Sequence, residues 1–108
     1  MARKPNILFF HVDNLGMGEL GCYGGGILRG ADTKRMDAFA KQGVKLTHYV
    51  VEPQCTPTRS ALMTGRCPIR SGNHTIALGG HGGGIVKWER TIRSILSDAG
   101  YATSIYGT

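Results

Sequence analysis

The 108-residue sequence predicts an α/β fold in which a mostly parallel central sheet is flanked by helices. Residues 5–12 form a short, nearly continuous apolar run, which is typical of a strand buried on both faces of a parallel sheet. Two other segments, residues 33–43 and 91–99, repeat their apolar residues at helical spacing. The predicted order of strand, helix, strand, helix, helix and strand is that of an α/β unit.

Polar residues follow the first predicted strand directly. Asp13 and Asn14 come immediately after residues 5–12. In open α/β sheets, ligands bind at the carboxyl ends of the strands, so polar groups at this point are well placed to hold a metal ion. Asp13 and Asn14 are therefore candidate metal ligands, and a turn or cap role is the alternative for Asp13.

A helix and a strand are predicted next. Residues 33–43 suit a helix with Thr33 as its N-cap and Gly43 as its stop. Its apolar face consists of Met36, Phe39 and Ala40. Residues 44–50 alternate between polar and apolar side chains, as a half-buried strand does.

The last two predicted elements lie near the end of the sequence. Residues 91–99 suit a helix that Gly100 closes. Its apolar face consists of Ile92, Ile95, Leu96 and Ala99. Residues 101–106 then read as a further strand.

The most informative predicted helix lies between these elements and begins near Cys55. Pro57 suits a first helical turn, where its missing N–H is not needed, and Gly65 suits the end of the helix. Cys55 then lies at the positive end of the helix, where backbone amides and the helix dipole favour a thiolate or a bound oxyanion. Arg59 lies one turn further on and can donate two parallel hydrogen bonds to a tetrahedral anion. This spacing predicts an anion site.

The run C-T-P-T-R followed by S-A-L-M-T-G-R, from Cys55 to Arg66, resembles the signature of the type I sulfatases. These are the arylsulfatase-like branch of the alkaline phosphatase superfamily, and the resemblance implies part of that superfamily's α/β sandwich. It also implies that Cys55 is oxidised to formylglycine after translation. The hydrated aldehyde is then the nucleophile: one hydroxyl attacks sulfur and the other helps to expel sulfate. Cys55 and Arg59 are the catalytic residues that the resemblance implies.

The resemblance further implies a Ca²⁺ ion, a sulfate ester substrate and a formylglycine-generating maturase as partner. Asp13, Asn14 and the modified Cys55 match the positions of calcium ligands. Asn14 departs from the commoner pair of aspartates, and a neutral amide oxygen should weaken the site. Because the family's catalytic domain is several times longer, residues 1–108 are expected to be its incomplete N-terminal portion, inactive alone.

Three functions stay open at this point. The first is sulfuric ester hydrolysis of the arylsulfatase type. The second is hydrolysis of phosphonate monoesters or phosphodiesters, because related enzymes share the Cys-x-Pro-x-Arg nucleophile. The third is a remnant or basic binding module without turnover.

Composition narrows the other possibilities. Thirteen Lys and Arg against seven Asp and Glu give a net charge of +6, but the basic residues are scattered, so nucleic acid is not an expected partner. Three cysteines without metal-ligand spacing indicate neither a disulfide framework nor a zinc site, and Cys22 and Cys67 are interpreted as structural thiols.

The first apolar run is too short for a signal or membrane helix. The chain as given is expected to be cytoplasmic, or periplasmic or secreted if an upstream signal is missing. Asn73-His74-Thr75 is a formal glycosylation triplet.

Overall fold

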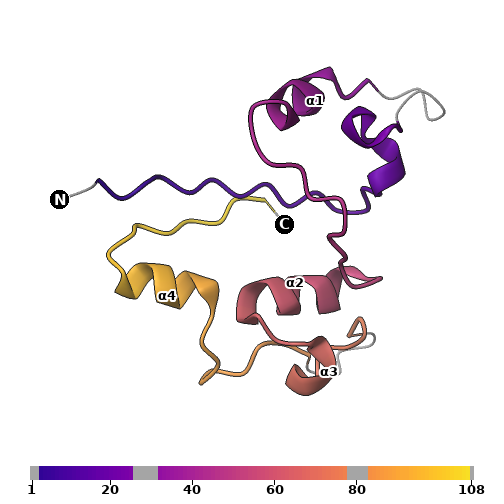
Figure 1. Ribbon diagram of the computed structural model, residues 1–108. Coiled ribbons are helices and arrows are strands. Elements are labelled where there is room, and N and C mark those ends of the chain that lie inside the picture. The colour runs from indigo at the N-terminus through magenta and orange to yellow at the C-terminus, as the bar shows by residue number, and fades with distance from the viewer. Residues whose placement is uncertain (1–2, 26–31, 78–82, 108) are drawn as a thin grey trace. The chain divides into compact units, whose positions relative to one another are not determined.

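The structure is a computed structural model that describes residues 3–25, 32–77 and 83–107. The chain divides into two compact units, Met1–Tyr49 and Val50–Thr108, and each is described by itself. Figure 1 traces the elements along the chain.

The first unit contains two short 3₁₀ helices and one α-helix, namely η1 (Met17–Glu19), η2 (Gly21–Tyr23) and α1 (Lys34–Ala40). Side chains at the start of α1 hold η2. The carboxylate of Asp37 accepts hydrogen bonds from the Cys22 amide at 2.8 Å and from the Thr33 hydroxyl at 3.0 Å. The Thr33 hydroxyl in turn accepts from the Gly21 amide at 2.8 Å. Thr33 is the N-cap residue, as predicted, but its side chain binds η2 instead of the amides of its own helix.

The segment after α1 also packs on η2. The Tyr23 hydroxyl donates to the Leu46 carbonyl at 2.7 Å, and the Lys45 ammonium donates to the Cys22 carbonyl at 2.8 Å. The same ammonium lies 5.4 Å from the centre of the Tyr23 ring, within the range of a cation–π contact. Residues 44–49 are thus fixed by side chains rather than by a strand ladder.

The second unit is built from α2 (Cys55–Thr64), α3 (Pro68–Ser71) and α4 (Ile92–Asp98), and α2 contacts both of the others. The ends of these helices follow local sequence signals. Gly65 and Gly72 adopt the left-handed conformation that ends α2 and α3, with φ of 66° and 75°. Thr91 and Ser94 form a reciprocal capping box at the start of α4. The predicted helices at Cys55 and at residues 91–99 are confirmed, and α3 was not predicted.

The predicted parallel sheet is wrong for this structure. The described residues contain no strand, and residues 5–12, 44–50 and 101–106 form none of the strands expected there. Figure 1 shows the first of these segments as an extended trace. An extended segment becomes a strand only when a neighbouring segment supplies its hydrogen-bonding partners, and apolar periodicity does not provide that neighbour.

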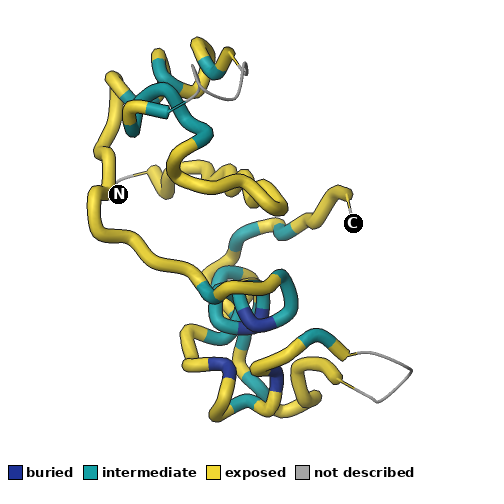
Figure 2. Tube along the Cα trace, turned by 90° about the vertical axis from the view of Figure 1, so that its right-hand side faces the viewer, coloured by how far each residue is buried: buried dark blue, intermediate teal, exposed yellow. Residues whose placement is uncertain are grey.

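Burial is concentrated in the second unit. The buried positions among the described residues are Pro57, Ser60, Pro68 and Asn73, and Figure 2 marks them in dark blue. No large apolar side chain of the described ranges is buried. The predicted apolar faces are therefore open to solvent, since Phe39 is 78% exposed on α1 and Ile95 is 51% exposed on α4.

Candidate functional site

Cys55 is the first residue of α2, as the sequence predicts. The preceding residue, Gln54, is extended and its side chain does not cap the helix, and the first turn contains no acidic residue. Cys55 is a free thiol of intermediate exposure. The positive end of the helix dipole therefore faces the Cys55 region without a side-chain carboxylate of its own first turn to oppose it.

Arg59 lies on the same helix, four residues beyond Cys55. Residues at this spacing share one helix face, about 6 Å apart between their Cβ atoms. Arg59 has intermediate exposure, and its Nε atom is buried. Partial burial of a guanidinium strengthens its hydrogen bonds to an anion, because less water competes for the donors. The structure thus brings the predicted nucleophile precursor and the predicted cation together on one turn of α2.

A polar network fixes the middle of α2. Ser60 is 4% exposed, and its hydroxyl lies 3.1 Å from the hydroxyl of Ser71 on α3. The side-chain amide of Asn73 lies 3.2 Å from the Ser71 carbonyl, 3.4 Å from its hydroxyl and 3.3 Å from the Gly84 carbonyl. Ser60, Ser71 and Asn73 therefore link α2 to α3 and to the segment before α4. Sequence reasoning missed this network, because half of these contacts have backbone acceptors that leave no signal in the sequence.

An ion pair holds the segment that follows α2. Arg66 and Glu89 approach to 2.8 Å between Nε and Oε1, with the Glu89 side chain only 13% exposed. At the end of the helix, the Thr64 hydroxyl donates to the Ser60 carbonyl at 2.7 Å. These contacts keep the C-terminal half of α2 in place while its first turn presents Cys55.

Asp13 and Asn14 occupy a turn in the first unit, after the extended segment. Both residues are exposed, and Asn14 has a φ of 57°, a left-handed conformation that asparagine tolerates better than most residues. A carboxylate and an amide oxygen fit a calcium ion by type, yet calcium takes six to eight oxygen ligands. Within the described ranges, no three His, Cys, Asp or Glu side chains cluster as a metal site would require. Asp13 and Asn14 can thus supply only part of a calcium shell, and they lie in a different unit from Cys55 and Arg59.

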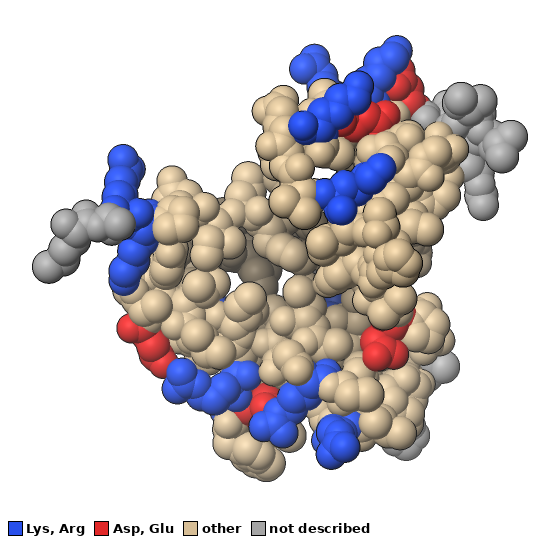
Figure 3. All heavy atoms as spheres, viewed as in Figure 1, with Lys and Arg blue, Asp and Glu red and all other residues tan. Residues whose placement is uncertain are grey.

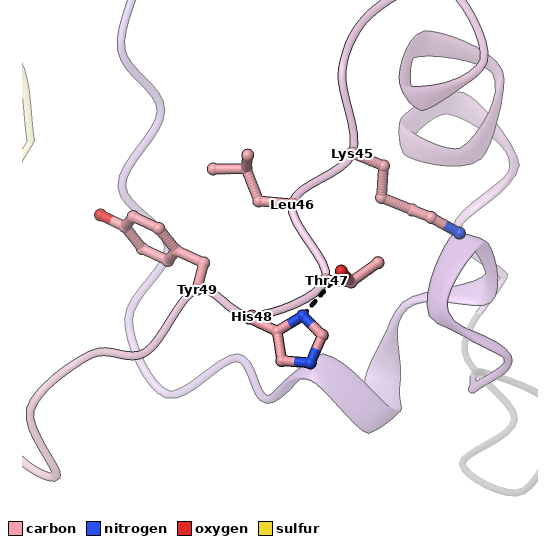
Figure 4. A pocket seen from close by; sticks show the side chains of 5 residues that line it. All are labelled: Lys45, Leu46, Thr47, His48 and Tyr49. Carbon is pink, nitrogen blue, oxygen red and sulfur yellow. Dashed lines mark hydrogen bonds between the residues drawn. The ribbon is translucent and has the colours of Figure 1, made fainter.

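A shallow hollow in the first unit is lined by Lys45, Leu46, Thr47, His48 and Tyr49. Figure 4 shows that Lys45 points away from the side where Leu46 and Tyr49 project, and that His48 bonds its neighbour Thr47 at 3.0 Å. The hollow is formed by consecutive residues of one segment and contains none of the predicted site residues.

The charged side chains of the described residues add no further site. On the face in Figure 3, Lys and Arg side chains are spread over several separate places and acidic side chains lie among them. Two exposed pairs, Lys34 with Asp32 at 2.6 Å and Arg90 with Asp98 at 2.9 Å, illustrate this mixing. Exposed pairs of this kind contribute little to stability. None of the helices in the described parts has the length and apolar composition that a bilayer crossing requires.

Comparison with known proteins accounts for the signature. A family model described as Sulfatase matches residues 5–108. Human steryl-sulfatase is 42% identical over 113 residues, which cover 98% of this chain and 19% of that protein. Human arylsulfatase D is 42% identical over 113 residues, covering 98% of this chain and 18% of that protein. Human arylsulfatase A is 38% identical over 109 residues, covering 99% of this chain and 21% of that protein.

The chain thus spans about a fifth of the length of these relatives. No solved structure gives a significant match. The family match includes both the Asp13–Asn14 turn and helix α2, so it covers every predicted site residue. This chain belongs to the sulfatase family.

Proposed function

We propose that this chain provides the nucleophile and an anion-binding arginine of an arylsulfatase-like sulfuric ester hydrolase. One observation carries the proposal: Cys55 is the first residue of α2, and Arg59 follows one turn later on the same face. Family membership and the names of the sulfatase relatives support sulfate esters as the substrate class.

The roles of the two residues follow from their places on α2. Oxidised to formylglycine and hydrated, residue 55 would supply a nucleophilic hydroxyl where the thiol now stands. Arg59 binds the sulfate group through its planar donor fork and orients it toward residue 55. The dipole at the start of α2 adds favourable potential for the negative charge that the sulfate group carries. Such fixed donors stabilise charge in the transition state without having to reorganise.

Calcium and a maturase complete the proposal. Asp13 and Asn14 would hold a calcium ion through their carboxylate and amide oxygens, and further oxygen ligands would complete its shell. A formylglycine-generating enzyme is the partner that would oxidise Cys55. The Cys55 thiol is of intermediate exposure, so part of it is open to such an enzyme.

The test combines mass spectrometry with a comparison of substrates. The protein is purified from its native host, and the peptide that contains residue 55 is examined for the aldehyde. Hydrolysis rates are then measured on an aryl sulfate and on the matching aryl phosphonate monoester. We expect the aldehyde at residue 55 and faster hydrolysis of the sulfate. Turnover by a protein with an unmodified thiol, or a clear preference for the phosphonate, would contradict the proposal.

Two cysteine variants provide the control. Cys55→Ala should abolish turnover, because it removes the precursor of the nucleophile. Cys67→Ala should retain turnover, because Cys67 is an exposed thiol that precedes α3 and plays no part in the proposed chemistry. Equal losses in both variants would show that the assay reports folding instead of chemistry.

A further inference from the structure

A residue of α2 itself binds the segment that precedes the helix. The Thr58 hydroxyl donates to the Glu52 carbonyl at 2.9 Å, and the Thr58 amide donates to the Gln54 carbonyl at 3.1 Å. Both carbonyls precede Cys55, and Thr58 follows it. Two hydrogen bonds made by Thr58 therefore span position 55 along the chain.

The usual means of fixing a helix start is absent here. The Gln54 side chain makes no cap hydrogen bond, and Pro57 in the first turn has no amide to donate. Pro57 is fully buried, so packing of its ring also holds the first turn. Glu52 and Thr58 are of intermediate exposure. The Thr58 hydroxyl is thus a side-chain contact that ties the segment before the helix to its first turn.

We infer that Thr58 is a positioning residue for residue 55. Its hydroxyl holds the segment before the helix, so that the side chain at position 55 keeps one orientation relative to Arg59. Without the hydroxyl, the backbone amide bond to Gln54 remains but the segment from Glu52 to Gln54 loses its tie and moves more freely. The catalytic part of this inference rests on the proposed function, whereas the restraint on residue 55 does not.

The first measurement follows thiol reactivity in protein expressed without a maturase, where residue 55 keeps its thiol. Alkylation by iodoacetamide is measured by peptide mass spectrometry for Cys55, with the exposed Cys67 as an internal reference. Loss of one hydrogen bond should raise the relative rate at Cys55 about fivefold in Thr58→Val, which keeps the side-chain shape. Thr58→Ser retains the hydroxyl and should stay within about twofold of the wild type.

Thr64→Val is the matched control. It removes a threonine hydroxyl that donates to a backbone carbonyl of the same helix, the Ser60 carbonyl at 2.7 Å, but at the far end from Cys55. We expect no change at Cys55 in this variant. An unchanged rate in Thr58→Val, or an equal increase in Thr64→Val, would overturn the inference. If circular dichroism shows that valine lowers the helix content, Thr58→Ala replaces it with the same expectation.

The second measurement concerns turnover by matured protein, normalised to the aldehyde content at residue 55. Thr58→Val should lower kcat about tenfold with KM nearly unchanged, since small misplacements of a reacting group cost rate more than binding. Thr58→Ser should restore kcat. A change confined to KM would contradict a positioning role. Absence of both the aldehyde and turnover in the wild-type protein would refute the proposed function. The alkylation rates would then still test whether Thr58 restrains residue 55.

Discussion

Asn73 offers a direct test of the network that supports α2. Its side chain is 3% exposed, and its Nδ2 group lies near three acceptors, the carbonyls of Ser71 and Gly84 and the Ser71 hydroxyl. An amide NH₂ has two hydrogens, so it satisfies at most two of these acceptors at once. Asn73→Ala removes both bonds and leaves part-buried contacts without this donor.

The expected loss follows from that count. A typical hydrogen bond contributes about 1 kcal/mol net, so two bonds contribute about 2 kcal/mol to the local free energy of opening. The contact of 3.2 Å lies at the long end of the usual range and those of 3.3 Å and 3.4 Å lie beyond it, so the loss should not exceed this figure. A loss of about 2 kcal/mol corresponds to amide exchange about 30-fold faster in segments that open locally.

Hydrogen exchange measured by mass spectrometry reads this effect segment by segment. The Asn73 amide, which donates to the Pro68 carbonyl at 3.0 Å, and the Arg70 amide, which donates to Cys67 at 2.9 Å, should lose protection. The Ala99 amide at the end of α4 should keep its protection, because it is bonded within its own helix to Ile95.

Thr75→Ala is the matched control for this prediction. It destroys the same Asn-x-Thr triplet, but it removes only an exposed hydroxyl that bonds the neighbouring Ile76 carbonyl. Exchange around α3 should therefore stay at the wild-type rate in this variant. If Asn73→Ala leaves exchange unchanged, or if Thr75→Ala accelerates it equally, the network does not stabilise α3 as described.

Three further predictions concern other parts of the molecule. Gly21→Ala should lower the free energy of unfolding of the first unit by about 2 kcal/mol in a denaturant melt. The added Cβ would overlap the Asp37 carboxylate and displace it from the Cys22 amide and the Thr33 hydroxyl. An unchanged melt would show that the Asp37 side chain can shift without losing these bonds. Asn14→Asp should tighten calcium binding by about tenfold in isothermal titration, because it adds a negative ligand, and an equal affinity would remove Asn14 from the metal shell. Arg59→Lys should lower kcat/KM on an aryl sulfate by about 100-fold, because a lysine cannot donate the two parallel bonds of the guanidinium, and near wild-type activity would argue against a bidentate role.

The helices could be predicted because their signals are local. Pro57 and Gly65 mark the first turn and the end of α2 within ten residues, and Gly100, with a φ of 84°, follows the end of α4. Each of these residues acts on the backbone of its own segment, so its effect can be read from spacing alone. The relation between Cys55 and Arg59 was predictable for the same reason.

The strands and the burial pattern could not be predicted in this way. An apolar run such as residues 5–12 forms a strand only beside a paired segment, and that pairing is absent from the described residues. Thr33 illustrates a second limit of sequence patterns. It has the sequence of an N-cap, yet its hydroxyl serves a contact with Gly21, which is twelve residues away.

The site was predictable only in part. The types of Asp13 and Asn14 indicate a hard cation, but the ligand number that calcium needs depends on other parts of the fold. The structural contacts of Thr58 and Asn73 were not predicted, because their partners are mainly backbone carbonyls, which every residue possesses. Small polar residues in and next to a helix that carries a catalytic signature are the signal that could have drawn attention to them.

The open extended segment at the start of the chain has a practical consequence. Ile7, Leu8, Phe9 and Phe10 are 58%, 79%, 61% and 80% exposed, and they form an uncharged run without proline or glycine. Runs with this composition stack readily into intermolecular β-structure, and charged residues at their flanks are the common natural protection. Here the charged residues Arg3 and Lys4 precede the apolar run, and Asp13 follows it. Preparations of this polypeptide should therefore stay monomeric longest at low ionic strength, where repulsion between the flanking basic residues of neighbouring chains is least screened.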